Sequence, residues 1–310
     1  MSPRSLIALA GTAALLVSCG NKNEGPPLAS HAPKSNSESE GIYWQAKKAD
    51  DAGDREKAIK LYDEAADRSV YAQNSAQARF RQAQLLEQKG DLVNAFKAYQ
   101  QFVVGYQGSG LYTKALERQV VIADSAANGV IKTSFLGLKS GLSREKVVEM
   151  LEEVRNNAPK SAVAAHAQLS LGQLYEKQKK DKEAIEAYKK VVSDYQDRSE
   201  AAEAQFRVAR VYINQAERGN QNQATINLAR EALQDYLNQY PNHHRAGEAR
   251  RLMADLGGRS VQRSFDVAEF YLKTKEYESA KVYYREVVKR AGGNPLGQKA
   301  KSRLAELGEH

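Results

Sequence analysis

The chain of 310 residues has one cysteine, Cys19, seven prolines and five histidines. A single thiol excludes an intramolecular disulfide, so the folded part has to be stabilised by packing alone. No His-x-x-x-His pair or cysteine cluster offers the spacing of a metal site, and no Gly-x-x-x-x-Gly-Lys-Ser/Thr loop is present to hold a phosphate. No serine has a histidine at a spacing that suggests nucleophilic catalysis. We therefore expect a protein that is not an enzyme and that holds no metal or cofactor.

The net charge of +8 is not concentrated in a basic block. Lysines alternate with glutamates along segments such as 183–190, a pattern typical of a solvated helix face. A basic balance is also compatible with nucleic acid, anionic lipid or an acidic protein as partner. Because the N-terminus indicates export, we expect no nucleic-acid partner.

The N-terminus carries Arg4, an apolar run over residues 6–17 and the tetrad Leu16-Val17-Ser18-Cys19. The run is too short to span a bilayer, and the small Ser18 suits signal peptidase cleavage. The tetrad resembles the lipobox of bacterial lipoproteins. That resemblance implies a signal peptide over residues 1–18 and acylation of Cys19, and two or more acyl chains anchor a protein durably. An ordinary signal peptide with a chance cysteine is the alternative.

Residues 19–40 are polar and rich in proline, glycine and serine, which indicates a tether with an r.m.s. reach of roughly 25 Å. Beyond them the composition turns to Ala, Leu, Tyr, Glu, Lys, Gln and Arg, the residues of helices. We expect residues 41–308 to form the folded part.

The helical part repeats itself. Leu171, Gly172, Tyr175, Ala184 and Tyr188 stand where a tetratricopeptide repeat carries alternating large and small side chains. Gly172 and Ala184 would let two antiparallel helices cross closely. The same register recurs through the chain, and Gly53-Asp54, Gly90-Asp91 and Lys180-Asp181 mark turns between paired helices. The sequence thus predicts an all-α fold, a right-handed α-solenoid of about six helix pairs; a generic helical bundle is the alternative.

In this repeat type the first helix of each pair lines the concave groove. The register places two rows of side chains there: Tyr43, Phe80, Leu169 and Phe206, then, one turn later, Lys47, Gln84, Gln173 and Arg210. An aromatic row backed by amides and cations suits an extended peptide that ends in an aromatic residue and a carboxylate. The alternative is that the rings pack against the neighbouring repeat.

Two segments, 128–142 and 217–228, are longer than a regular repeat allows. Residues 128–142 contain an apolar stretch, 130–138, which is unusual for a connection. We expect it to tuck into the stack, and an exposed patch for a partner is the alternative. Gly257-Gly258 is expected to interrupt a helix.

The lipobox, the tether and the solenoid together resemble the D lipoproteins of the outer-membrane β-barrel assembly machinery. The sharpest match is LNQYPN at 237–242, ARRL at 249–252 and VAEFYL at 267–272. The resemblance implies a lipid-anchored protein on the periplasmic face of the outer membrane. Gly20, where aspartate marks inner-membrane retention in some bacteria, agrees with that location.

The partners that the resemblance implies are the barrel-forming subunit with its periplasmic repeat domains, other assembly lipoproteins and unfolded outer-membrane proteins. It assigns the groove around Tyr43, Lys47, Phe80 and Gln84 to the substrate, and Arg259 to the partner interface. This chain departs from the family in having six helix pairs instead of five, and in the glycines before Arg259. A tetratricopeptide protein that coordinates peptidoglycan synthesis with envelope constriction is the alternative function, and a tetratricopeptide lipoprotein of another role is a third.

Overall fold

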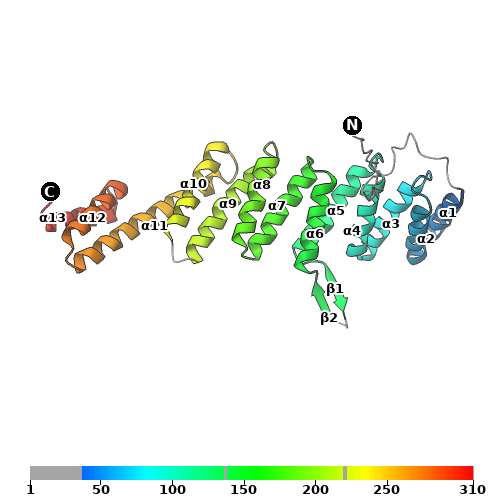
Figure 1. The fold of residues 1–310 in the computed structure, drawn as a ribbon, viewed down its shortest axis with the longest axis horizontal. Helices are drawn as coiled ribbons and strands as arrows, with labels where there is room; N and C mark the ends of the chain where they lie inside the picture. Colours follow the sequence, from blue (N-terminus) through cyan, green and yellow to red (C-terminus); the bar gives the residue numbers. More distant parts are fainter. Residues whose placement is uncertain (1–36, 136–137, 219–221, 310) are drawn as a thin grey trace, which may run out of the picture.

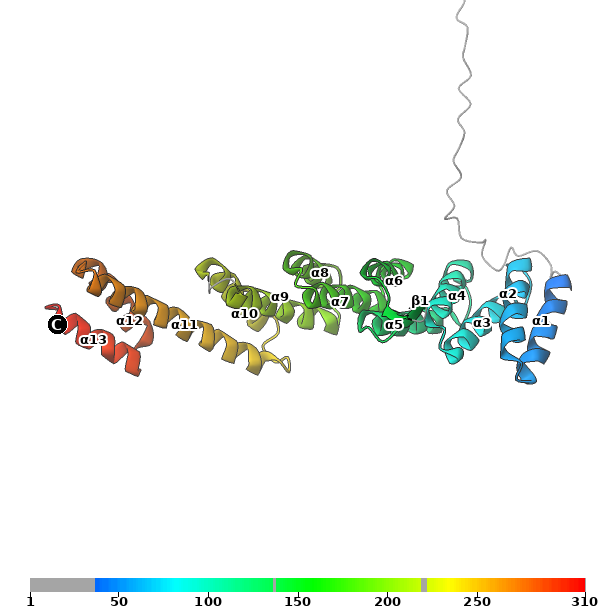
Figure 2. The ribbon, with the colours of Figure 1, turned by 90° about the horizontal axis from the view of Figure 1, so that it is seen from below.

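The computed structural model describes residues 37–135, 138–218 and 222–309. In these ranges the chain forms 13 helices that follow one another along an elongated stack, with α1 and α13 at opposite ends (Figures 1 and 2). The helices are α1 Ser37–Asp51, α2 Arg55–Arg68, α3 Ser75–Lys89, α4 Leu92–Gly105, α5 Tyr112–Ala127, α6 Arg144–Asn157, α7 Ala162–Lys177, α8 Asp181–Asp194, α9 Ser199–Arg218, α10 Gln223–Gln239, α11 Ala246–Lys273, α12 Tyr277–Ala291 and α13 Pro295–Glu306. The predicted all-α solenoid of six pairs is confirmed, with α13 added at its end.

Small residues set the closest helix crossings, as the sequence predicts. A Cβ placed on Gly172 in α7 would lie 2.4 Å from Cε1 of Tyr188 in α8, so only glycine fits there. In other pairs the equivalent residues of the first helix are alanines, Ala46, Ala83 and Ala209, all fully buried. The bulky neighbours can therefore interlock at the density of a protein interior.

The turns inside the pairs follow helix-capping chemistry in two of the three predicted places. Gly53 and Gly90 adopt positive φ angles of 78° and 85°, and the next residues, Asp54 and Asp91, accept a hydrogen bond from the backbone of α2 and α4. At the third place Asp181 is the first residue of α8 and not its cap. Its carboxylate binds Arg218 instead, and Lys179 takes the left-handed conformation.

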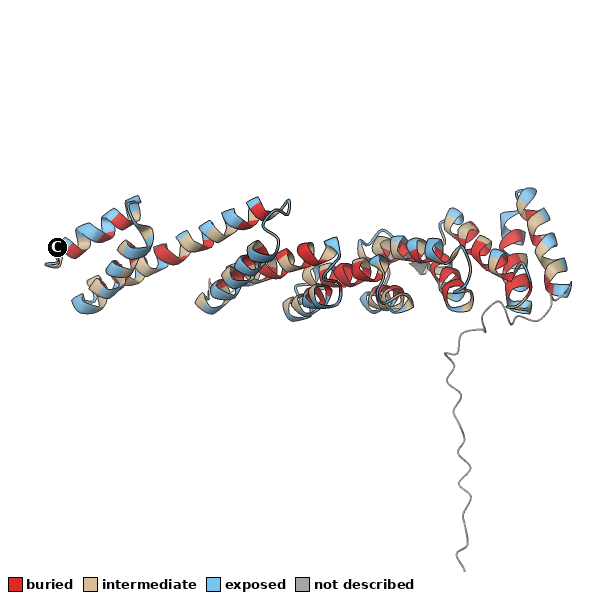
Figure 3. Cartoon of the chain, turned by 90° about the horizontal axis from the view of Figure 1, so that it is seen from above, coloured by how far each residue is buried: buried red, intermediate tan, exposed pale blue. Residues whose placement is uncertain are grey.

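Four tyrosines form the centre of the core, one on the second helix of each of four pairs: Tyr99, Tyr188, Tyr236 and Tyr284 are fully buried. Buried residues run along the interior of the whole stack (Figure 3). The apolar clusters of α9–α10 and of α12–α13 share no residue, although both include residues of α11.

Helix α11 contradicts the expected interruption at Gly257-Gly258. It runs unbroken from Ala246 to Lys273, 28 residues. Its first half packs with α9 and α10 through Ala249 and Leu256, whereas its second half packs with α12 through Val261 and Ala268. One helix thus serves two layers of the stack. The glycines lie between the halves, where each would have no neighbour within 4 Å of an added Cβ.

The apolar connection forms a β-hairpin. Strands β1 Lys132–Phe135 and β2 Leu138–Gly141 pair antiparallel, with Lys132 opposite Gly141. Ile131 enters the core, but the hairpin projects from the stack beyond the ends of α5 and α6 (Figure 1). The expectation that this segment tucks into the stack is therefore wrong for the hairpin, because its backbone groups are paired in a ladder of their own.

Helix α1 begins at Ser37, four residues before the expected start at residue 41. Ser39 is buried and donates a hydrogen bond to the carbonyl of Ala65 at 2.7 Å, and Glu40 accepts one from the backbone of Asn74 at 3.0 Å. Residues 37–40 therefore belong to the stack. The expected signal peptide, Cys19 and the remaining tether lie outside the described residues. No helix in the described ranges combines the length and apolarity needed to cross a bilayer.

Candidate partner-binding site

The central rings of the predicted groove are buried in the core. Phe80 on α3 is 5% exposed, and its ring packs 5.4 Å from that of Phe102. Phe206 on α9 is 2% exposed, with Tyr236 at 5.4 Å and the guanidinium of Arg245 at 5.0 Å above it. Leu169 on α7 is buried as well. The expectation of an aromatic row in the groove is corrected accordingly. These three side chains pack a first helix against its neighbours in the stack and are not accessible to a ligand.

The polar residues of the groove are half-buried, and three of the four already have partners. Lys47 on α1 binds Asp51 at 2.9 Å, which raises the pKa of Lys47 through that hydrogen bond. Gln84 accepts a hydrogen bond from Arg81 at 3.4 Å, and Arg210 binds Glu248 of α11 at 3.3 Å. Gln173 on α7 is half-buried. A ligand would have to compete with these internal contacts for all but the most exposed groups.

The N-terminal end of the groove retains an accessible aromatic pair. The half-buried ring of Tyr43 stands 5.2 Å from that of Trp44, which is 58% exposed. Sequence reasoning missed Trp44, although it is the only tryptophan of the chain and follows the groove residue Tyr43 directly. An exposed tryptophan beside a tyrosine is the kind of anchor that dominates protein interfaces.

The exposure of Trp44 follows from its place in the repeat. The residue at this register position on α3 and α9 is an arginine, Arg81 or Arg207, that binds a carboxylate of the preceding helix pair. The described stack has no pair before α1, so Trp44 has no neighbour to cover it.

These arginines belong to a contact that recurs along the stack. A carboxylate near the end of a first helix accepts hydrogen bonds from a tyrosine of its own pair and from an arginine of the next. The four sets are Asp50 with Tyr62 and Arg81, Glu87 with Tyr99 and Arg118, Glu176 with Tyr188 and Arg207, and Glu269 with Tyr284 and Arg303. The hydrogen bond from Arg81 lowers the pKa of Asp50, and burial raises the pKa of Tyr99 to about 12. The contact fixes one repeat against the next.

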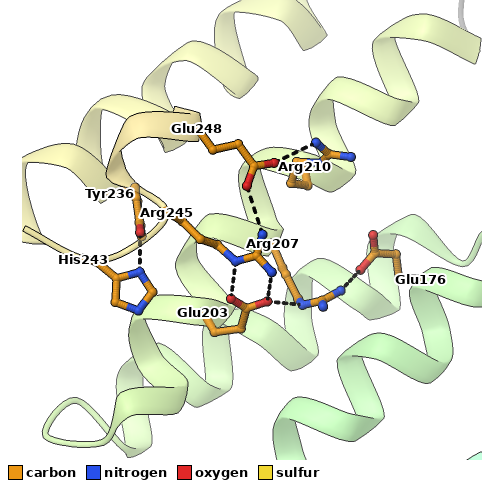
Figure 4. Close-up of polar contacts among 8 residues, drawn as sticks. All are labelled: Glu176, Glu203, Arg207, Arg210, Tyr236, His243, Arg245 and Glu248. Atoms are coloured by element: carbon orange, nitrogen blue, oxygen red, sulfur yellow. Dashed lines mark hydrogen bonds and ion pairs between the residues drawn. The ribbon is translucent and has the colours of Figure 1, made fainter. Parts of the chain in front are cut away.

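Around Arg210 the contacts merge into a network between α9 and α11 (Figure 4). Glu203 accepts hydrogen bonds from Nε of Arg207 at 2.8 Å and from Nε of Arg245 at 2.7 Å. Arg245 also donates to Glu248, the partner of Arg210. Figure 4 shows these groups directed at one another, which indicates a structural joint between the two helices.

Arg259 lies on α11 directly after the glycine pair and is 37% exposed at its side chain. It binds Glu217 of α9 at 3.0 Å and Asp255 one turn earlier at 2.9 Å. The two carboxylates raise its pKa, chiefly through the hydrogen bond to Glu217. Because the helix is continuous, the glycines do not displace this arginine from the helical register.

The protein consists of stacked helix pairs whose polar side chains bind one pair to the next. This arrangement defines its class: a tetratricopeptide-repeat solenoid, a fold that generally binds other proteins. The described residues contain no cluster of three or more His, Cys, Asp or Glu that fits a metal ion. A tetratricopeptide repeat model matches residues 43–110. The family model YfiO, described as outer membrane lipoprotein, matches residues 138–305, more than half of the chain. The chain belongs to this family of outer membrane lipoproteins, and the resemblance noted in the sequence is confirmed.

Several solved tetratricopeptide structures are similar in fold at low identity. A tetratricopeptide repeat protein from Parabacteroides merdae is 14% identical, covers 88% of this chain and 100% of its own, and has a TM-score of 0.36. A repeat protein fragment from Cytophaga hutchinsonii is 14% identical over 86% of this chain and 87% of its own, with a TM-score of 0.38. MamA from Desulfovibrio magneticus is 14% identical over 67% and 98%, with a TM-score of 0.33. No curated protein matches the chain significantly.

Proposed function

We propose that this protein is a non-catalytic scaffold of the β-barrel assembly machinery, anchored by acylated Cys19 on the periplasmic face of the outer membrane. It binds the barrel-forming subunit through that subunit's periplasmic repeat domains, and it works beside the other assembly lipoproteins. It also receives unfolded outer-membrane proteins before their insertion.

One observation carries the proposal: the outer membrane lipoprotein family covers residues 138–305, the part of the stack that includes Arg259. The N-terminal pairs add further tetratricopeptide repeats, a fold whose elongated stack offers a long surface for other proteins. The lipobox tetrad and the polar segment after it supply the expected anchor and its tether.

The substrate end of the proposed scaffold is the N-terminal mouth of the groove, formed by Tyr43, Trp44, Lys47 and Gln84. The exposed indole and the half-buried phenol offer apolar anchors, and the neighbouring amine can bind a carboxylate once it leaves Asp51. These properties suit an extended peptide with an aromatic residue near its carboxyl end.

Depletion of the protein in its own cell tests the assembly role. We expect many outer-membrane barrel proteins to fall together, measured by quantitative mass spectrometry of outer membranes, and a β-barrel subunit with periplasmic repeat domains to co-purify from detergent-solubilised envelope. Recovery of cell-wall synthases with unchanged barrel proteins would instead support the alternative role in envelope constriction.

The anchor is tested separately. Incorporation of labelled palmitate should require Cys19, so a Cys19→Ala variant should be unlabelled and should leave the membrane fraction. A Ser18→Ala variant keeps a small residue before the cleavage site and is the matched control. Labelling that persists in Cys19→Ala would contradict acylation at this residue.

A further inference from the structure

A second surface, separate from the groove and from Arg259, lies where α10 and α12 flank α11. Two adjoining hollows, of ≈ 510 Å³ and ≈ 440 Å³, both include Arg230 of α10 and Arg290 of α12 in their walls. Because the walls are shared, the hollows form one cleft across α11. We call it the α11 cleft.

The floor of the cleft is lined by the glycine pair. Gly257 and Gly258 belong to the smaller hollow, and a Cβ at either position would meet nothing within 4 Å. Packing of the helices therefore does not require glycine here, unlike at Gly172. The missing side chains instead leave open space above the backbone of α11, so that a ligand can approach the helix closely.

The two hollows carry more basic than acidic side chains, and a third hollow that also borders Arg230 adds one acid, Glu231. Arg230, Arg263 and Arg290 come from three different helices, and Glu286 is the one acidic residue among the described residues that line the two hollows. Glu286 forms an ion pair with Arg290 at 2.8 Å, which neutralises both charges. Arg290 also donates a hydrogen bond to the buried hydroxyl of Ser260 at 2.9 Å, which holds its guanidinium over the floor.

Arg230 supplies the observation that points to a ligand. Arg230 is half-buried, and no hydrogen bond or ion pair joins its guanidinium to another described residue. Partly buried polar groups in native proteins usually have a hydrogen-bond partner, and a guanidinium carries five donors that an acceptor can use. Since Arg230 lines both hollows, an acceptor placed in the cleft can complete its contacts.

We propose that the α11 cleft binds an extended acidic segment of a protein partner, with its carboxylates on Arg230 and Arg290. The planar fork of a guanidinium matches a carboxylate in two parallel hydrogen bonds. Val261 and Leu296 also line the smaller hollow and suit apolar side chains between the acids. Each hollow is far larger than a single inorganic anion, and both are open to solvent, so an extended segment can lie in the cleft. The inference goes beyond the proposed function and does not depend on it.

The test uses the mature chain and a fluorescein-labelled peptide, Gly-Glu-Leu-Glu-Gly-Glu-Leu-Glu-Gly, followed by fluorescence anisotropy. The same peptide with glutamine for every glutamate is the control ligand, and we expect it to bind at least about tenfold more weakly. An Arg230→Gln variant should lose roughly 10- to 100-fold in affinity for the acidic peptide, the range for a charge-assisted contact. Arg285→Gln, an arginine of α12 outside the cleft, should bind like the wild type.

Two further variants separate binding from folding. Gly258→Leu fills the cleft and improves helix propensity, so it should raise the melting temperature and lower the affinity for the acidic peptide. Arg230→Glu should bind a lysine-for-glutamate peptide better than the wild type does. Equal affinity for the glutamate and glutamine peptides, unchanged binding by Gly258→Leu, or displacement of the peptide by inorganic phosphate at equal concentration would each overturn the proposal.

Discussion

At the scale of single residues, Gly172 and Gly258 are predicted to respond in opposite ways to alanine. In Gly172→Ala the new methyl collides with Tyr188, whose ring is held by the hydrogen bond from its hydroxyl to Glu176 at 2.6 Å. Overpacking of this kind costs roughly 1–3 kcal/mol, which outweighs the helix propensity gained. Gly258→Ala meets no neighbour, so it should stabilise by about 0.5–1 kcal/mol. Urea unfolding measures both, and equal midpoints for the two variants would contradict the close crossing.

Phe80 and Trp44 are likewise predicted to separate stability from binding. Phe80→Ala removes a buried ring and should cost about 3–5 kcal/mol in unfolding free energy. Trp44→Ala removes an exposed one and should change it by less than about 0.5 kcal/mol. A Tyr43→Ala, Trp44→Ala double variant should lose affinity for an aromatic-ended peptide while remaining folded by circular dichroism. Unchanged affinity of that folded variant for the peptide would contradict a binding role for the groove mouth.

The same residues show what the sequence can and cannot reveal. Small residues at close crossings and glycine caps are local requirements, so Gly172, Gly53 and Gly90 were predictable. Whether Phe80 faces the groove or the core depends on rings of another helix that the repeat register does not place. The α11 cleft was missed for a related reason, since the glycine pair was interpreted as a helix break and Arg230 and Arg290 meet only after three helices have packed.

At the scale of helices, the contact between α5 and α7 is predicted to depend on pH. In this contact Ser170 stands at the register position where α3 and α9 carry Arg81 and Arg207. Asp124 accepts hydrogen bonds from Nε2 of His166 and from the hydroxyl of Ser170, both at 2.6 Å. The hydrogen bond to Asp124 raises the pKa of His166 above 6.5, and Glu200 adds to the shift. A raised pKa in the folded state means that the contribution to stability is complete below pH 6.5 and is lost as the pH rises through the folded value.

Urea unfolding between pH 5.5 and 8.5 measures this dependence, and a His166→Gln variant should flatten that part of the profile. His243 is the internal comparison, because burial lowers its pKa and its contribution is lost as the pH falls. A His243→Gln variant should therefore change the acid side of the profile and leave the loss at higher pH in place. An identical profile in wild type and His166→Gln would contradict the role of this contact.

At the scale of the whole molecule, the stack is predicted to respond to damage locally. Each helix pair contacts mainly its neighbours, and α12 and α13 join the rest of the described stack through α11, whose two halves belong to separate apolar clusters. In such a chain, stability is approximately a sum over repeats and their interfaces. A Leu304→Ala variant, which costs about 2–5 kcal/mol in the last cluster, should speed amide hydrogen exchange in α12 and α13. Helices α3 and α4 should exchange as in the wild type. In Phe80→Ala, by contrast, exchange should become faster in α3 and α4 and stay unchanged in α12 and α13. Faster amide exchange along all helices in either variant would mean that the solenoid opens as one cooperative unit. The continuous helix α11 would then couple the stability of the two ends of the stack.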